Sequence, residues 1–306
     1  MPSSMAPTWR GRSRSSVPGS GKPNAMNDSG ENLDKAVAAG FGREWSTFDQ
    51  SEAELSMADR QAIFSSYFHI FPWDELPPDP VGLDVGCGSG RWAVMVAPRV
   101  GHLHLLDASE AALGVAKRNL ASAGNATFHL ASVGDIPLGD GSLDFAFSLG
   151  VLHHVPDTAA AIRAVSKKLK RGAPFLIYLY YALDNRPFWF RAIWQLSNLM
   201  RLLISRLPPA AKLLTSQFLA ATIYWPLARF AALLERARIS SKMVPLQAYR
   251  DRDFYVMRTD AYDRFCTRLE QRFTRRQIER MLLDAGLEAI RFSDEPPFWC
   301  AVGRRR

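Results

Sequence analysis

The sequence contains little cysteine, and its cysteines are far apart. Three occur in 306 residues, Cys87, Cys266 and Cys300, and no two of them form a C-x-x-C pair. Neither a disulfide framework nor a structural zinc site is typical of so few and so widely spaced cysteines. We therefore expect a protein of a reducing compartment, the cytoplasm, without a bound metal ion.

The sequence also lacks a long run that is apolar throughout. The strongest candidate is a helical stretch, residues 213–228, which has 16 residues without a charge. Pro208 and Pro209 are expected to end the helix before it, and Pro226 is expected to kink it. A bilayer span needs about 20 apolar residues, and this run also contains Thr215, Ser216, Gln217 and Thr222. We therefore expect no transmembrane helix.

Acidic residues are missing from the first 25 residues, which are rich in Ser, Pro, Gly and Arg. Such a composition buries too little apolar surface to fold, and it lacks the apolar segment of a secretory signal. Residues 1–25 are therefore predicted to be a disordered tail, with Met26 as the working start. An organelle transit peptide is the alternative, because such peptides are also rich in Arg and Ser and poor in acids.

The net charge of +8 is unevenly distributed. Residues 186–252 carry 11 basic and two acidic groups, a net of +9, whereas residues 26–185 carry 12 basic and 19 acidic groups, a net of −7. A nucleic-acid groove would need basic groups around the binding half of the chain. We therefore expect no nucleic-acid partner.

Short β-rich runs alternate with helical stretches from residue 81 onward. The predicted strands are 81–85, 102–106, 126–130, 143–149 and 175–180, with 287–292 and 298–302 near the end. This rhythm indicates an α/β fold with a parallel sheet and helices on both faces. The predicted organisation is an N-terminal helical lid segment (26–80), a core (81–182), an insertion (183–253) and a C-terminal completion of the core (254–306).

The insertion is basic and amphipathic. Its apolar stripe has steps of three and four residues, which place all members on one helix face: Trp189, Ile193, Leu196, Met200, Leu203 and Leu207. Three interpretations stay open for residues 186–245. They form a cap on the sheet, a peripheral contact with anionic membrane headgroups and a lipid-like acceptor, or a dimer contact.

The stretch GLDVGCGSGRW (82–92) contains three alternating glycines, Gly86, Gly88 and Gly90. A phosphate-binding P-loop would require a lysine, and none occurs between Lys35 and Lys117. A dinucleotide fingerprint G-x-G-x-x-G would place its last glycine at position 91, which is Arg91. A plain tight turn is the remaining alternative.

Polar groups follow the predicted strands in a regular order. Asp107 closes the second strand, Asp135 and Ile136 follow the third, and SLGVLHHVPD follows the fourth. A carboxylate at the tip of the second strand, beside a glycine turn, can accept both hydroxyls of a ribose. The series therefore indicates a nucleoside-containing cofactor at the carboxyl edge of the sheet.

These stretches resemble the class I S-adenosylmethionine-dependent methyltransferases, in their small-molecule branch. The resemblance rests on LDVGCGSGRW, LHLLDAS, VGDIPLGDGSLDFAFSLGVLHHV and LKRGAPFLIY, with FGREWSTF before them and RFTRRQIERMLLDAGLEAIRF after them. It covers roughly residues 40–182 and 253–303 and leaves the insertion unmatched. It implies a Rossmann-like doubly wound sheet, mostly parallel with an antiparallel last strand, and S-adenosyl-L-methionine as cofactor.

The resemblance also implies which residues bind that cofactor. The glycine loop with Asp84 would lie under the methionine part, and Asp107 would bind the ribose. Asp135 with Ile136 would bind the adenine, and the residues after the fourth strand would lie near the sulfonium. Arg91 would pair with the cofactor carboxylate, unless it is a solvated surface arginine. The full set is Asp84, Gly86, Gly88, Gly90, Arg91, Asp107, Asp135, Ile136, Leu149 and Gly150.

Methyl transfer to a hydroxyl or an acidic carbon also needs a base. His153 and His154 follow the fourth strand and are the best candidates, although the pair can equally be structural. Tyr67, His69, Tyr180 and Tyr181 are weaker candidates, and Phe41, Trp45 and Phe48 would form a lid or pack in the core. The sequence thus predicts a methyltransferase for a small or lipid-like acceptor. The alternatives are an NAD-dependent oxidoreductase and a non-catalytic relative that binds a partner or a membrane.

Overall fold

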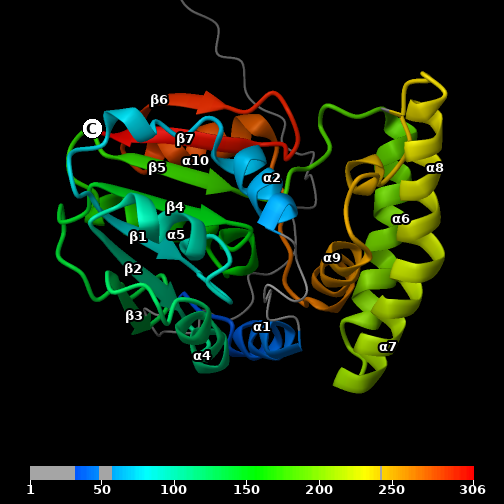
Figure 1. Cartoon of the computed structure of the whole chain (residues 1–306), viewed down its shortest axis with the longest axis horizontal. Helices are drawn as coiled ribbons and strands as arrows, with labels where there is room; N and C mark the ends of the chain where they lie inside the picture. The colour runs from blue at the N-terminus through cyan, green and yellow to red at the C-terminus, as the bar shows by residue number, and fades with distance from the viewer. Residues whose placement is uncertain (1–31, 48–56, 242) are drawn as a thin grey trace, which may run out of the picture.

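One seven-stranded sheet organises the chain, in the strand order β3-β2-β1-β4-β5-β7-β6 (Figure 1). The computed structural model describes residues 32–47, 57–241 and 243–306. The strands are β1 (Val81–Val85), β2 (His102–Asp107), β3 (Ala126–Leu130), β4 (Phe145–Leu149), β5 (Pro174–Tyr178), β6 (Leu287–Phe292) and β7 (Cys300–Arg305). All pairings are parallel except those of β7, which runs antiparallel to β5 and β6. The predicted Rossmann-like sheet with its antiparallel last strand is confirmed.

Helices bury both faces of this sheet. On one face α5 (Thr158–Lys168) and α10 (Arg275–Asp284) pack on Leu83, Ala146 and Ile177. On the other face α2 (Met57–Phe68), α3 (Ala93–Val96) and α4 (Glu110–Asn119) pack on residues such as Leu105 and Phe147. Strands covered on both sides are continuously apolar, which explains why the central strands were visible in the sequence.

Several predicted boundaries shift in the structure. β4 begins at Phe145, because Leu143 makes only an isolated bridge with Leu169. β5 ends at Tyr178, and Tyr180 is therefore free to enter the loop above the sheet. The last strand begins at Cys300 instead of residue 298. Phe48 and residues 1–25 lie outside the described residues. Trp45 belongs to α1 (Lys35–Thr47), but its side chain is outside the described part of the chain.

The insertion forms a separate helical layer beside the carboxyl ends of the strands (Figure 1). It contains α6 (Phe188–Ile204), α7 (Pro209–Leu219), a π-helical turn (Ala220–Tyr224) and α8 (Trp225–Arg236). The next helix, α9 (Phe254–Cys266), was assigned to the C-terminal completion of the core. It instead packs on α6 and α7 through Met257, Ala261 and Phe265. We call α6 to α9 the cap.

The structure has one continuous helix where a kinked helix was predicted around Pro226. Pro208 and Pro209 end α6 as predicted, but Pro209 is the first residue of α7, a position where its missing N–H costs nothing. The π-helical turn just before Pro226 accommodates the proline in the helix, which is continuous from Pro209 to Arg236.

This continuous helix bears on the expectation that the chain has no transmembrane helix. Within the described residues, Pro209–Arg236 is one helix of 28 residues that is long and apolar enough to cross a membrane, judged by length and composition alone. Only 28% of its most apolar window is buried in the fold. The expectation without a transmembrane helix rested on the 16-residue length of the uncharged run and on its polar residues, whereas the helix extends beyond that run at both ends.

Candidate active site

The glycine loop after β1 adopts a backbone that only glycine tolerates easily. Gly86, Gly88 and Gly90 all have positive φ, at 73°, 55° and 76°. A Cβ on Gly86 would lie 2.3 Å from a methyl group of Val151, so the chain after β4 presses directly on the loop. The loop therefore forms a cradle without side chains at the carboxyl edge of the sheet.

Asp107 holds this loop in place from the end of β2. Its Oδ2 accepts the backbone N–H of Gly88 at 2.9 Å, and its Oδ1 accepts that of Ser109 at 2.8 Å. Burial raises the pKa of Asp107, and these backbone hydrogen bonds partly offset that rise. Each oxygen keeps a further lone pair for the hydroxyls of a ligand, which is the arrangement that a ribose requires.

Asp84 is buried beneath the same loop. Its Oδ2 has no hydrogen-bond partner within the described part of the chain, and only 1% of the residue is exposed. Burial, with a further contribution from Asp107, holds the pKa of Asp84 well above its ordinary value. An orphaned buried carboxyl is costly without a partner. A cationic amino group of a ligand in the loop would supply one.

A cavity of about 940 Å³ extends from this loop to the cap. On the core side it is lined by the predicted residues Gly86, Arg91, Asp107, Leu149, Gly150 and His154. On the cap side it is lined by residues of α6, α8 and α9 and of the loop 244–252. Six tyrosines surround it, Tyr67, Tyr178, Tyr180, Tyr181, Tyr224 and Tyr249.

The structure places the other predicted site residues outside the lining. Asp84, Gly88, Gly90 and His153 are not among the residues that line the cavity, and their roles stay predictions. Asp135 is exposed and Ile136 packs in the core, while Ser132 and Val133, a few residues earlier, face the cavity. An adenine contact by Asp135 and Ile136 stays a prediction.

Arg91 extends from the loop toward the cap. Its guanidinium lies 4.4 Å from the ring centre of Trp92. Its charge also acts on Asp260 of α9, lowering a pKa that burial raises. Arg91 is therefore a cavity residue and not a freely solvated one.

The two histidines after β4 have different surroundings. His153 is fully buried, its ring stacks on Tyr180 at 3.8 Å, and its Nδ1 faces the backbone N–H of Tyr180 at 3.4 Å. Burial, followed by the charge of His154, keeps the pKa of His153 well below its ordinary value. His154 does line the cavity, and its Nδ1 lies 2.6 Å from the carbonyl oxygen of Leu269.

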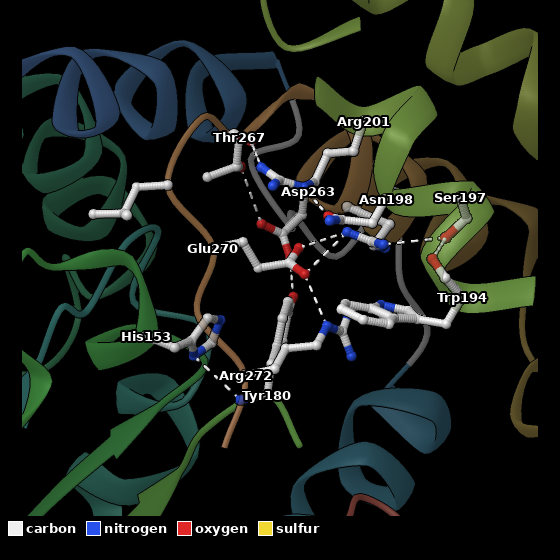
Figure 2. A network of polar contacts seen from close by, with 12 residues as sticks. His153, Tyr180, Trp194, Ser197, Asn198, Arg201, Asp263, Thr267, Glu270 and Arg272 are labelled. Atoms are coloured by element: carbon white, nitrogen blue, oxygen red, sulfur yellow. Dashed lines mark hydrogen bonds and ion pairs between the residues drawn. The ribbon is translucent and has the colours of Figure 1, made fainter. Parts of the chain in front are cut away.

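A polar network closes the cavity on the cap side (Figure 2). Glu270 is nearly inaccessible and accepts both a paired hydrogen bond from Arg264 at 2.9 Å and one from Arg272 at 2.8 Å. Although burial opposes it, Arg272 and Arg264 hold the pKa of Glu270 below its ordinary value. Tyr180 donates a short hydrogen bond to Asp263, which stands on α9 beside this cluster.

This network could not be predicted from the sequence. Asp260 and Asp263 are one helical turn apart and share the inner face of α9. Their partners Tyr180 and Tyr249 come from other parts of the chain. Only the amphipathic spacing of α9 could have hinted at a polar inner face, and the partners give no local signal.

Comparison with known proteins agrees with this geometry. Residues 83–177 match the family model described as a methyltransferase domain. A ubiquinone biosynthesis O-methyltransferase of Aromatoleum aromaticum is 32% identical over 108 residues, which is 35% of this chain and 44% of that protein. An uncharacterized methyltransferase of Synechocystis is 32% identical over 126 residues, 40% of this chain and 58% of that protein.

A solved methyltransferase structure from Thermotoga maritima superposes on 88% of this chain and 100% of its own, at 12% identity and a TM-score of 0.47. The chain matches about half the length of the curated relatives. The similarity lies in the core: residues 83–177 match a methyltransferase domain, a family whose cofactor is S-adenosyl-L-methionine.

Proposed function

We propose that the protein transfers a methyl group from S-adenosyl-L-methionine to a small, hydrophobic acceptor enclosed by the cap. One observation carries this proposal: the cavity is continuous from the glycine loop and Asp107 to α6, α8 and α9. The cofactor supplies a methyl group already activated by a sulfonium. The chain has to hold an acceptor in line with that methyl group, and positioning alone is worth roughly 7–11 kcal/mol of the barrier.

The size and lining of the cavity favour an apolar acceptor larger than a simple amine or alcohol. About 940 Å³ exceeds what a nucleoside cofactor alone would need, and it is near the upper end of typical ligand sites. The cap side adds Phe190, Trp194, Leu227 and Phe298 to the tyrosine lining. A lipid-like or aromatic acceptor fits such walls, and two related proteins carry the name O-methyltransferase in ubiquinone biosynthesis.

Calorimetric titration of the whole chain tests the cofactor part. S-adenosylhomocysteine is expected to bind near the micromolar range, about −8 kcal/mol, and NAD is expected not to bind. Binding of NAD instead would favour an oxidoreductase. Binding of neither ligand would favour a non-catalytic relative that binds a partner through the cap.

We further propose that the outer face of the cap contacts an anionic membrane surface. This face, defined by exposed apolar residues of α6, α7 and α8 that do not line the cavity, comprises Leu199, Leu203, Leu214, Phe218, Trp225, Phe230 and Leu233, each between 47% and 73% exposed. In Figure 1, α6, α7 and α8 form the layer of the cap on the side away from the sheet. Arg229 stands on α8 midway between Trp225 and Leu233, with Arg206 and Arg236 also exposed.

Charge supports a lipid surface as the occupant. Residues 188–236 contain six basic groups and one acidic group, Glu235, which is paired with Arg250. Aromatic and aliphatic side chains interspersed with arginine are typical of helices that lie in the headgroup layer. A membrane-associated enzyme would also have direct access to a lipid-like acceptor.

Liposome co-sedimentation tests this contact. Full-length protein should sediment with vesicles that contain phosphatidylglycerol, and Phe218→Glu combined with Phe230→Glu should abolish sedimentation while S-adenosylhomocysteine binding persists. Equal sedimentation of both forms would refute the membrane contact. A concentration-dependent dimer that the double variant dissolves, without vesicle binding, would assign the face to a second copy of the chain.

A further inference from the structure

The cap brings a carboxylate to the place where an acceptor would react. Asp263 lies on α9, and its side chain remains 17% exposed on the cavity side. Its partners stand above the carboxyl ends of two central strands, because Tyr180 follows β5 and His154 follows β4. Ligands of open α/β sheets bind at that edge. Asp263 thus joins the cap to the reaction side of the core.

His154 has one hydrogen-bonded ring nitrogen and one buried ring nitrogen. A carbonyl oxygen can only accept, so the Nδ1 atom that lies 2.6 Å from Leu269 O carries a hydrogen and donates it. Nε2 is directed at Asp263 Oδ1 at 3.7 Å. His153 does not line the cavity. The Nε2 atoms of His153 and His154 make no hydrogen bond within the described residues and are both buried, so neither is accessible to an acceptor in this arrangement.

We propose, on the basis of the proposed methyltransferase function, that Asp263 is the catalytic base and takes the proton of a phenolic acceptor. Tyr180 and His154 are positioning residues in this account. The Tyr180 hydroxyl donates to Oδ2 of Asp263, and Thr267 faces Oδ1 at 3.5 Å. These contacts fix the carboxylate and leave its remaining lone pairs for the acceptor.

The protonation states of Tyr180 and Asp263 support this assignment. Burial, and next the charge of Asp263, keep the pKa of Tyr180 well above its ordinary value, so its hydroxyl stays a donor. Burial also raises the pKa of Asp263, against the opposing effects of His154 and Tyr180. A carboxylate with a raised pKa is a stronger base than an exposed one.

The acceptor class follows from base strength and from the walls of the cavity. A phenol has a pKa near 10, whereas a hydroxyl comparable to water has a pKa near 15.7, so a carboxylate can deprotonate only the former with ease. Aromatic side chains line the same cavity as Asp263, among them Tyr178, Tyr181 and Trp194. A planar phenol can stack on such rings.

The step balances in atoms and charge. Asp263 accepts the hydroxyl proton, and the freed electron pair on the phenol oxygen forms the new bond to the methyl carbon. The electron pair of the methyl–sulfur bond stays on sulfur, which leaves the neutral thioether S-adenosylhomocysteine. No metal ion or further co-reactant is needed for this balance.

The test uses 4-nitrophenol, whose ionised form absorbs visible light. The probe is added to the full chain with bound S-adenosylhomocysteine, at a pH where the free probe is mostly protonated. The wild type is expected to convert the bound probe to the phenolate. Asp263→Asn should bind S-adenosylhomocysteine unchanged, lose the phenolate spectrum and slow methylation of the probe by roughly 10²–10⁴-fold.

Asp260→Asn is the matched control, because Asp260 stands one turn away on the same face and accepts the Tyr249 hydroxyl at 2.8 Å. This variant should keep the phenolate spectrum. Loss of the spectrum in Asp260→Asn but not in Asp263→Asn would overturn the assignment. If Asp263→Asn does not fold, the wild type decides alone: its bound probe must ionise well below the pKa of the free probe.

Failures of the two proposals are distinguishable. Absence of S-adenosylhomocysteine binding by the wild type would refute the methyltransferase function. Normal S-adenosylhomocysteine binding, combined with a probe that does not bind or that binds as the neutral phenol, would refute Asp263 as a base for phenols. The methyltransferase function would stand in that case.

Discussion

The backbone nitrogen of Gly88 and Oδ2 of Asp107 are joined by a hydrogen bond of 2.9 Å that crosses from the loop after β1 to the end of β2. This single contact makes the shape of the glycine loop depend on the carboxylate that is placed to bind a ribose. The cofactor cradle and its most specific polar group are therefore one unit.

Replacing Asp107 by Asn should weaken S-adenosylhomocysteine binding by roughly 10–100-fold. Hydrogen bonds to charged groups contribute about 1.5–3 kcal/mol, and 1.4 kcal/mol is a factor of ten. Calorimetry measures the change. Asp140→Asn, an exposed carboxylate paired with Lys168, is the control and should bind normally. Unchanged affinity in Asp107→Asn would remove Asp107 from the cofactor site.

Replacing Gly86 by Ala should destabilise the fold by roughly 2–5 kcal/mol, because a positive φ and a clash with Val151 add together. Gly141→Ala is the matched control. Gly141 also has positive φ, at 64°, but nothing lies within 4 Å of an added Cβ, so a loss of only about 1–2 kcal/mol is expected. Urea unfolding of both variants compares them, and equal losses would contradict the tight contact with Val151.

Glu270→Gln should destabilise the protein by about 3–5 kcal/mol, since it leaves Arg264 and Arg272 largely buried without their counter-charge. Asp284→Asn, which removes an exposed pair with Arg280, should have no measurable effect. Thermal and urea unfolding check both. A tolerated Glu270→Gln would mean that water compensates the two arginines.

Three histidines on β2 and β3 should make stability depend on pH. His104 Nδ1 lies 3.0 Å from His129 Nε2, and burial together with the charges of His102 and His129 lowers the pKa of His104 from 6.5 to about 4. Between these values the unfolded chain binds a proton that the folded chain does not. The stabilising contribution is therefore present above pH 6.5 and lost as the pH falls toward 4.

The variant His104→Gln isolates this effect. The free energy of unfolding of the wild type should fall more steeply than that of the variant between pH 6.5 and pH 4, and the two slopes should agree outside this window. Parallel curves across the whole range would show that His104 titrates normally in the folded protein.

The features that could be predicted from the sequence are those with a local sequence pattern. The central strands are continuous apolar runs, and Asp107 is recognisable because it ends one of them beside the glycine loop. Asp263 gave no such signal. Its partner Tyr180 is 83 residues away in the sequence, and the contact exists only because α9 folds back onto the cap. The continuous helix from Pro209 to Arg236 was not predicted for another reason. Its π-helical turn accommodates Pro226, at which the sequence pattern indicated a kink.

A crystal structure of the full chain with S-adenosylhomocysteine tests the central claim most directly. The account predicts that the ribose hydroxyls bind Asp107, that the amino group reaches the loop above Asp84, and that the sulfur faces the space between Gly150 and Asp263. A ligand bound elsewhere, or one whose sulfur points away from the cap, would contradict a shared site of core and cap.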